Sequence, residues 1–374
     1  MADRAVAVLT PLPGARPRPA AAALAALCLL GGLAGQAAAE LVPVPPPPFP
    51  AACDDLDPQS LIDAIEREAA AVARLPAAPG FRFGDRTITP ADYASTTLRP
   101  LAELARRGAE ALCAELPRRF AFYKSAGAGP GKFTAYHNPL LAGSRTRHHD
   151  YQHPLYRRPP GALAKLPTAD ILAGALDGKG LELIYLRDAT EALGAHVEGS
   201  ATVQLDDGGQ INVGSDGHNG LPYTNVSKLL LADGKIPKDQ VTPIEMTRAR
   251  KYFLDHPGEL AAYWGKNPHF VFFKPSPHRG GGKFGELVPG RSLAVDPAQT
   301  PLGLALYIRT DKPAIAANKV QSWVPFGRVA LAQDTGAGIV GPGRVDVFFG
   351  TGDYAAQASA VTTRPGEVYV LLAR

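Results

Sequence analysis

The chain has 374 residues, of which 45% are hydrophobic and 20% are charged. This length allows one or two packed domains, and the composition is that of a folded protein rather than a disordered one. The formal net charge of +4 is spread along the chain, without a Lys/Arg block interleaved with aromatic residues, so we expect no nucleic-acid partner. The 39 glycines and 36 prolines favour short strands and tight turns over a helical bundle.

Residues 1–39 have the pattern of a secretory signal peptide. Arginines precede an apolar run over residues 20–34, and Ala37-Ala38-Ala39 supplies small residues for cleavage before Glu40. A membrane anchor is the alternative, but the run is shorter than the roughly 20 residues that a spanning helix needs. Cys28 raises a lipoprotein as a third option, although Leu27 occupies the position where a small residue is required. We therefore expect an exported, soluble mature protein.

Two cysteines, Cys53 and Cys113, follow this segment. An oxidising compartment permits a bridge between them, and the sequence leaves the pairing open. Their spacing is not that of a metal site, and the adjacent His148 and His149 do not converge as ligands on one helix face would. We expect a solvated loop at these histidines, with no metal and no cofactor in the protein.

Residues 40–56 are rich in proline, and PVPPPPFP at residues 43–50 predicts an extended spacer. Asp57-Pro58 then has the pattern of an N-cap and first turn, and apolar residues recur with helical spacing as far as Val72. A second helical region is predicted over residues 90–122. We expect both helical regions to serve packing.

From about Phe133 the pattern changes to short segments bounded by Gly, Pro, Asp and Asn. Residues 197–213 predict two strands joined by a turn at Asp206-Asp207-Gly208-Gly209. Further short strands are predicted at residues 270–273, 304–308, 328–331, 344–348 and 367–372. Short strands joined by tight turns favour small barrels.

Three aspartates near the C-terminus stand in strand-like surroundings beside Gly or Pro: Asp296, Asp334 and Asp346. A carboxyl group that is partly buried near another carboxyl has a raised pKa, which suits a general acid at near-neutral pH. Taken singly, Asp296 and Asp334 are equally well explained as turn caps.

Several motifs in a fixed order make the chain recognisable. Residues 131–160 read GKFTAYHNPLLAGSRTRHHDYQHPLYRRPP, and HVEGSATVQLDDGG, HNGLPYTNVSKLLLADGKI and NPHFVFF follow. The C-terminal part contains AVDPAQTPLG and AQDTGAGIVGPGRVDVFFGTG, with the three aspartates. From about Gly80 onward the chain resembles the MltA family of lytic transglycosylases.

This resemblance implies a mainly β fold: a double-psi β-barrel domain with flanking N-terminal helices, and a second, small β-barrel domain inserted into it. On this chain the first domain would comprise residues 57–137 and 275–374, and the inserted domain residues 138–274. The glycan would lie between the two domains. The family cleaves the β-1,4 bond between N-acetylmuramic acid and N-acetylglucosamine without water, which leaves a 1,6-anhydromuramoyl end.

The resemblance also assigns the acidic residues. Asp346 matches the catalytic aspartate, which would protonate the glycosidic oxygen and then take the proton of the muramoyl O6 hydroxyl. Asp334 matches a second aspartate, which would tune the pKa of Asp346 or stabilise positive charge that develops on the sugar. Asp296 matches the third, with a structural or supporting role. One carboxyl group suffices because an internal hydroxyl replaces the attacking water.

Four further positions match groove-facing residues of the family: Thr134, Tyr136, Gly199 and Ser200. The hydroxyl groups of Thr134 and Ser200 would bind sugar hydroxyls or acetamides, and Tyr136 would offer a ring face to a pyranose. The alternative is that Thr134 and Tyr136 are ordinary strand residues.

Three segments depart from the family pattern. Gln-Gly-Ser-Gly of the family is Glu198-Gly199-Ser200-Ala201 here, and Tyr-Ala-Gly-Lys-Asn-Gly is residues 215–220, SDGHNG. Val340 replaces a lysine after Asp334, and the loss of a cation should raise a carboxyl pKa. Glu198 is expected to add negative charge to the groove and to alter which glycan or stem peptide is accepted.

The leading hypothesis is thus an exported enzyme that acts on peptidoglycan glycan strands, as a monomer, in the periplasm or at the periplasmic face of the outer membrane of a Gram-negative-type bacterium. Association with the outer membrane or with cell-wall machinery is left open. Two alternatives remain: a glycan-binding protein that has lost cleavage, and a hydrolase of another polysaccharide on the same scaffold.

Overall fold

The structure is a computed structural model that describes residues 40–49, 52–237 and 248–374. The predicted signal peptide, with Cys28, lies outside these residues. Within the described ranges, no helix has both the length and the apolar character needed to cross a membrane.

Helix α1 (Pro58–Val72) begins and ends where the sequence predicts. The Asp57 side chain accepts a hydrogen bond from the Gln59 amide at 2.9 Å, and Pro58 occupies the first turn, where no intrahelical amide bond is lost. Leu61 and Ile65 are buried on the face that turns toward the core. The helix therefore forms from local signals and is held by packing.

The second helical region is a series of short helices rather than one: α2 (Pro90–Tyr93), a π-helical turn (Ala94–Leu98), α3 (Arg99–Arg106) and α4 (Ala109–Arg119). Gly108 separates α3 from α4 with a φ of 95°, a conformation that side-chain-bearing residues avoid. The predicted helical region extended to residue 122, but strand β4 (Phe120–Ser125) begins at Phe120, whose aromatic ring enters the core.

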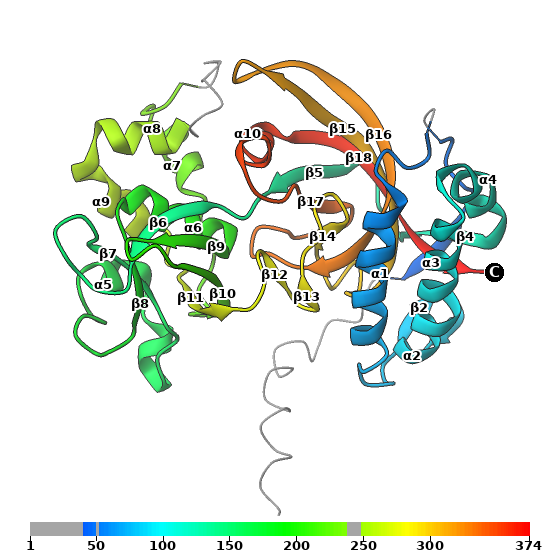
Figure 1. The fold of residues 1–374 in the computed structure, drawn as a ribbon, viewed down its shortest axis with the longest axis horizontal. Coiled ribbons are helices and arrows are strands. Elements are labelled where there is room, and N and C mark those ends of the chain that lie inside the picture. Colours follow the sequence, from blue (N-terminus) through cyan, green and yellow to red (C-terminus); the bar gives the residue numbers. More distant parts are fainter. Residues whose placement is uncertain (1–39, 50–51, 238–247) are drawn as a thin grey trace, which may run out of the picture. The chain divides into compact units, whose positions relative to one another are not determined.

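Six strands close into a barrel (Figure 1). They are β5 (Gly131–Tyr136), β14 (Ser292–Val295), β15 (Ala305–Ala316), β16 (Lys319–Asp334), β17 (Arg344–Phe348) and β18 (Thr363–Ala373). Their order is β15-β16-β14-β17-β5-β18, and β18 pairs in turn with β15, which closes the ring. The pairs β14–β16 and β17–β5 are parallel, and the other four are antiparallel. The barrel strands thus come from both sides of residues 140–276, which lie between β5 and β14.

The same sheet continues beyond β18 through β4 to β1 (Leu41–Val44), β2 (Phe81–Phe83) and β3 (Arg86–Ile88). The Pro-rich segment predicted as a spacer therefore starts as a strand, because Leu41 is buried and residues 41–44 pair with β4. Phe49 also packs its ring against Tyr307, with centroids 5.1 Å apart. The first described residues belong to the core of the fold.

A second, six-stranded sheet is built between β5 and β14 in the sequence (green in Figure 1). Its order is β11-β10-β9-β6-β8-β7, and the end strands β11 and β7 come within contact distance of each other. The strands are β6 (Leu140–Ser144), β7 (His153–Tyr156), β8 (Glu182–Leu186), β9 (Ser200–Leu205), β10 (Gln210–His218) and β11 (Val271–Ser276). The predicted hairpin is confirmed as β9 and β10, joined at residues 206–209.

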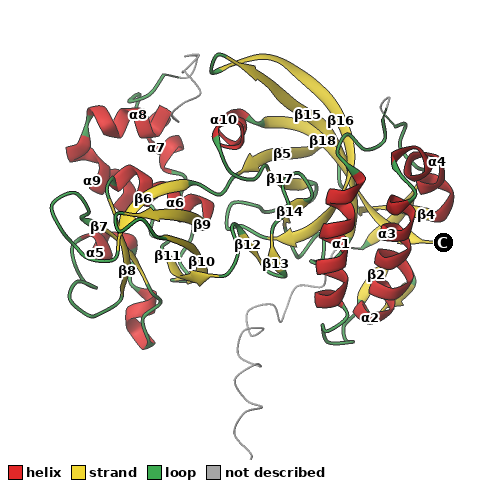
Figure 2. Cartoon of the chain, viewed as in Figure 1, coloured by secondary structure: helices red, strands yellow, loops and turns green. Residues whose placement is uncertain are grey.

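Short helices surround this second sheet (Figure 2). They are α5 (Thr168–Leu172), α6 (Ala189–Glu198), α7 (Val226–Ala232), α8 (Arg248–Asp255) and α9 (Leu260–Gly265), with 3₁₀ turns at Gly161–Lys165 and Pro257–Glu259. The chain then returns through the hairpin of β12 (Gly281–Gly282) and β13 (Gly285–Glu286), and helix α10 (Asp353–Val361) links β17 to β18. The second sheet has its own buried apolar core, distinct from that of the barrel.

The segment between the spacer and α1 is clamped to the barrel. Cys53 and Cys113 form a disulfide, which the sequence had left open. Asp54 accepts a 2.5 Å hydrogen bond from the guanidinium of Arg291, which is fully buried just before β14.

His149 is fully exposed, in agreement with the predicted solvated loop.

Candidate active site

One row of the barrel brings both candidate acids together with Thr134. The parallel pairing of β17 with β5 sets Asp346 opposite Thr134. On its other side, Asp346 lies opposite Ala294 of β14, which in turn lies opposite Asp334 of β16. Residues opposite each other on neighbouring strands project to the same face, so the two aspartates flank Ala294, about 10 Å apart at their backbones. Ala294, between them in this row, has a small side chain and is buried.

The carboxyl group of Asp346 is mostly buried and is bonded to Thr134, whose Oγ1 donates a hydrogen bond to Oδ1. Burial raises the pKa of Asp346, whereas the Thr134 bond and the charge of Arg344 lower it in part. The desolvation cost of a buried carboxylate exceeds these two stabilising contacts. Asp346 therefore keeps its proton to higher pH than a free aspartate does.

Asp334 ends strand β16 and has two hydrogen bonds. Its Oδ2 accepts one from the Tyr136 hydroxyl at 3.1 Å, and its Oδ1 accepts one from the Thr335 amide at 2.9 Å. Burial is the main cause that raises the pKa of Asp334 to about 6, and the negative charge of Asp346 adds to the increase. Tyr136 and Ala294, which neighbour the aspartates, belong to a small buried apolar cluster. Its members are Tyr136, Leu287, Ala294, Ile339 and Phe348.

Asp296 has a different environment. Its Oδ1 accepts a hydrogen bond from the Ala298 amide at 3.0 Å, and its Oδ2 accepts one from the Gly341 amide at 2.7 Å. The carboxylate thus caps its own turn and ties it to the loop that precedes β17. This geometry corresponds to the structural role considered for Asp296.

Glu198 differs from the sequence expectation. Its Oε2 accepts a hydrogen bond from the backbone amide of His137 at 3.1 Å, and only 16% of its side chain is exposed. Burial, together with the charge of Asp346, raises the pKa of Glu198 to about 8. At neutral pH the carboxyl group is therefore mostly protonated, and little of the expected negative charge is present. The neighbouring His137 is also neutral, since burial lowers its pKa to about 4.

Gly199 and Ser200 lie where α6 meets β9. Gly199 ends the helix with a φ of 73°, the left-handed conformation that glycine adopts at helix ends. The buried Ser200 hydroxyl donates a hydrogen bond to Asn138 Oδ1 at 3.0 Å, so its donor already has an acceptor within the protein. Asn138 also bonds to Thr202 and to the Gly280 amide, and thereby joins the segments that enter and leave the second sheet. Sequence reasoning did not single out Asn138, because its partners are far away along the chain.

A cation near Asp334 comes from a different segment than Val340. Val340 itself is 72% exposed. Lys283, in the β12–β13 hairpin, lowers the pKa of Asp334 by its positive charge and is anchored through its amide to the Gln333 carbonyl at 3.0 Å. The pKa of Asp334 is raised, in the direction expected from the loss of a cation, but burial is the main cause and Lys283 opposes the increase.

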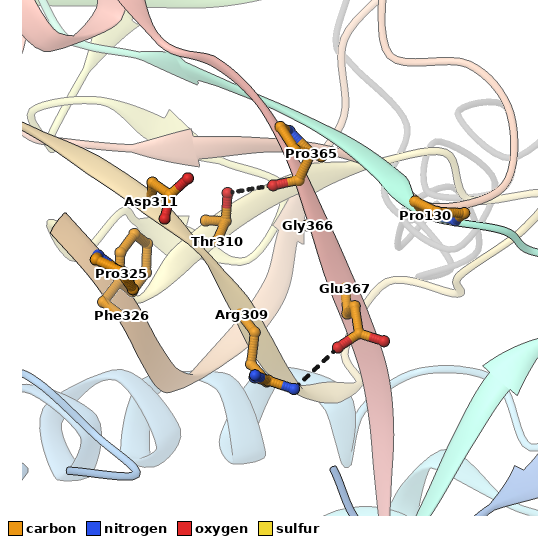
Figure 3. Close-up of a pocket in the computed structure, with 9 residues that line it drawn as sticks. All are labelled: Pro130, Arg309, Thr310, Asp311, Pro325, Phe326, Pro365, Gly366 and Glu367. Carbon is orange, nitrogen blue, oxygen red and sulfur yellow. Dashed lines mark hydrogen bonds and ion pairs between the residues drawn. The ribbon is translucent and has the colours of Figure 1, made fainter. Parts of the chain in front are cut away.

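Two cavities lie away from these aspartates. One, of about 330 Å³, is lined by β15, β16 and β18 and contains the ion pair of Arg309 with Glu367 at 3.1 Å (Figure 3). The other, of about 480 Å³, belongs to the second sheet and has Tyr156 and Trp264 in its wall. In the described part of the chain, no cluster of His, Cys, Asp and Glu side chains is arranged to hold a metal ion.

Comparisons with known proteins bear on this arrangement. The MltA specific insert domain matches residues 132–170 and 162–274, and the 3D domain matches residues 291–372. The solved structure of the lytic transglycosylase LtgG of Burkholderia pseudomallei is 30% identical, with a TM-score of 0.56, and the match covers 91% of this chain and 97% of that one. The chain belongs to the MltA family of lytic transglycosylases.

Other members of the MltA family agree with this assignment. Membrane-bound lytic murein transglycosylase A of Escherichia coli K12 is 31% identical over 249 residues, which are 65% of this chain and 66% of that protein, just under two thirds. The structure of E. coli MltA with bound chitohexaose has a TM-score of 0.71 at 23% identity and covers 91% of this chain and 96% of that one. The predicted family and the predicted mainly β, double-psi barrel fold are confirmed.

Proposed function

We propose that this MltA family member is a peptidoglycan lytic transglycosylase. It would cleave the β-1,4 bond between N-acetylmuramic acid and N-acetylglucosamine without water and leave 1,6-anhydromuramoyl ends. The observation that carries the proposal is Asp346: a mostly buried carboxyl group with a raised pKa, beside a second acid, in a family of lytic transglycosylases. Such a carboxyl group holds a proton under conditions where an exposed aspartate has lost it.

In the proposed reaction, protonated Asp346 gives its proton to the glycosidic oxygen as the bond from that oxygen to C1 of the muramoyl sugar breaks. The O6 hydroxyl of the same sugar then attacks C1, and the Asp346 carboxylate takes the O6 proton. One bond breaks, one forms, and Asp346 regains its proton, so neither water nor a second nucleophile is consumed. Attack within one sugar replaces the two-carboxylate arrangement of ordinary glycosidases.

Asp334 and Thr134 would support this cycle from opposite sides. Asp334 is ionised above a pH of about 6, and its carboxylate, two strands from Asp346, would stabilise positive charge that develops on the sugar. The Thr134 hydroxyl, which donates to Asp346, would stabilise the carboxylate form during the second proton transfer. Tyr136 would act through Asp334, because its hydroxyl is already bonded to that carboxylate.

We propose glycan strands of N-acetyl sugars as the substrate and, following the bound chitohexaose of the E. coli relative, chitohexaose as a ligand of this chain. We also propose export to the periplasm, where the Cys53–Cys113 disulfide would be stable. The E. coli relative is named membrane-bound, and we propose the periplasmic face of the outer membrane as a further location for this chain.

Mass spectrometry of purified peptidoglycan digested with the mature protein tests the activity. We expect 1,6-anhydromuropeptides from the wild type. The Asp346→Asn variant, which cannot donate a proton, should release them about 10²-fold to 10⁴-fold more slowly. Reducing-end products would instead identify a hydrolase. Binding to intact sacculi without any product would favour the glycan-binding alternative.

A further inference from the structure

The carboxyl group of Glu198 is bound on one side only. Glu198 is the last residue of α6, and its Oε2 accepts the amide hydrogen of His137, the first residue after β5. Its Oε1 lies 3.5 Å from His137 Nδ1, beyond normal hydrogen-bond length. One oxygen is thus fixed by the backbone, and the other, in a side chain that is 16% exposed, has no hydrogen bond among the described residues. The buried His137 Nδ1 likewise has no hydrogen-bond partner there.

Four titratable groups face Glu198 from the elements around it. His137 and Tyr136 come from β5 and its end, Asp346 comes from β17, and Tyr223 comes from the loop before α7. At neutral pH none of the four is a cation, since the pKa of His137 is lowered to about 4 by burial. A carboxylate at this position would have no compensating charge and would face Asp346, so the neutral acid is the stable form.

A neutral glutamic acid has nearly the shape and hydrogen-bonding pattern of glutamine. Its carbonyl oxygen accepts, here from the His137 amide, and its hydroxyl donates where the side-chain amide of glutamine would donate. Glutamine is the residue of the MltA family motif at this position. The substitution in this chain therefore preserves a donor, but only while the carboxyl group keeps its proton.

We propose that Glu198 is a specificity-determining residue that donates a hydrogen bond from its neutral carboxyl group to the acetamide carbonyl oxygen of an N-acetyl sugar beside Asp346. This inference rests on the proposed function, because it deepens the description of the same site. The acetamide carbonyl is the strongest neutral acceptor on such a glycan, and a buried donor left without it would be costly.

The donor is lost when the carboxyl group ionises. The raised pKa of Glu198, about 8, means that the donor is present below that pH and disappears as the pH rises through it. Above this range the group is an acceptor with a negative charge, which repels the acetamide oxygen. Glycan binding should therefore weaken on the alkaline side in this chain, and glutamine at position 198 should abolish that dependence.

Isothermal titration calorimetry with chitohexaose at pH 7 and pH 9 tests this inference on the wild type, Glu198→Gln and Glu198→Ala. For the wild type we expect the Kd to rise about tenfold between the two pH values, because pH 9 lies one unit above the pKa of about 8. For Glu198→Gln the Kd should not change with pH beyond about twofold, and at pH 7 this variant should bind more tightly than Glu198→Ala. At pH 8 the wild type should take up protons on binding, and Glu198→Gln should take up fewer.

Two results would overturn the inference: the same alkaline weakening in wild type and Glu198→Gln, or equally tight binding by Glu198→Ala and the wild type at pH 7. Thermal unfolding curves identify any variant that fails to fold. If Glu198→Ala fails to fold, the comparison of the wild type with Glu198→Gln remains as the test. Failure of the proposed function is a separate outcome, because it is read from the absence of anhydro products at pH 7, whereas the role of Glu198 is read from binding alone.

Discussion

At the scale of single residues, the site is governed by which carboxyl groups can keep a proton. Three acids with raised pKa values lie close together, and the contacts of each differ: a threonine hydroxyl for Asp346, a tyrosine hydroxyl and a lysine charge for Asp334, and a backbone amide for Glu198. Their titrations are coupled, because the charge of one raises the pKa of its neighbours. The order in which they lose protons therefore sets the pH range of the proposed reaction.

Thr134→Val tests the contact that lowers the pKa of Asp346. Its hydroxyl bond favours the carboxylate, so its removal should raise that pKa further. A general acid works only while protonated, so the alkaline limb of the kcat/KM profile should move to higher pH. Thr134→Ser keeps the hydroxyl and serves as the control; coincident limbs for the two variants would disprove the role of this bond.

The limits of sequence reasoning are also visible residue by residue. Asp346 and Asp334 stand out because each follows a strand-like run, and a family motif contains them. The protonated state of Glu198 was not predictable, since it depends on His137, 61 positions away, and on the charge of Asp346. A raised carboxyl pKa was expected from the change at Val340, but burial is the main cause of the raised pKa of Asp334, and the effect of Lys283 from a different hairpin was not predictable.

At the scale of elements, local signals predicted α1 and β17 with their observed ends, because a capped helix and a Gly-bounded apolar run are determined by neighbours in the sequence. Strands β15 and β16 run well beyond their predicted ends as a long hairpin. Their outer parts contain Pro and exposed polar residues, and only the cross-strand pairing makes them strands. The sequence therefore predicted too short a length for strands that are stabilised by cross-strand pairing.

The clamp before α1 has a measurable effect on stability. Asp54→Ala leaves the fully buried Arg291 guanidinium without its carboxylate partner, so the free energy of unfolding should fall by about 3–5 kcal/mol in urea titrations. Arg67→Ala removes an ion pair with Glu286 whose side chains are 48% and 38% exposed. This control should lose less than about 1 kcal/mol. Equal losses in the two variants would contradict the argument from burial.

At the scale of the whole molecule, stability depends on acids that the folded chain keeps protonated. Glu68 of α1 is fully buried, and its only hydrogen bond is from Gln333 at 2.7 Å, which leaves Oε1 without a partner among the described residues. Burial raises the pKa of Glu68 from 4.5 to about 8. Between these two values the folded state binds a proton that the unfolded state has released, so this group lowers stability as the pH rises.

Glu68→Gln should remove this dependence. The advantage of the variant over the wild type in free energy of unfolding should grow from pH 5 to pH 8 by roughly 3–4 kcal/mol in total, because each pH unit between the two pKa values contributes about 1.4 kcal/mol per proton. Urea unfolding at the two pH values measures it. Glu66→Gln, on the same helix with a side chain that is 58% exposed, is the control and should show little change with pH. A constant difference between Glu68→Gln and the wild type would contradict the assigned protonation.

The closure of the barrel also fixes when the proposed acid can be assembled. Thr134 and Asp346 are 212 positions apart, and β18, which holds β5, β15 and β4 together, follows both in the sequence. A chain that is still being synthesised, or still threading through a membrane, has no closed ring of strands and no Thr134–Asp346 contact. The order of the strands thus delays the assembly of the proposed site until nearly the whole polypeptide has emerged.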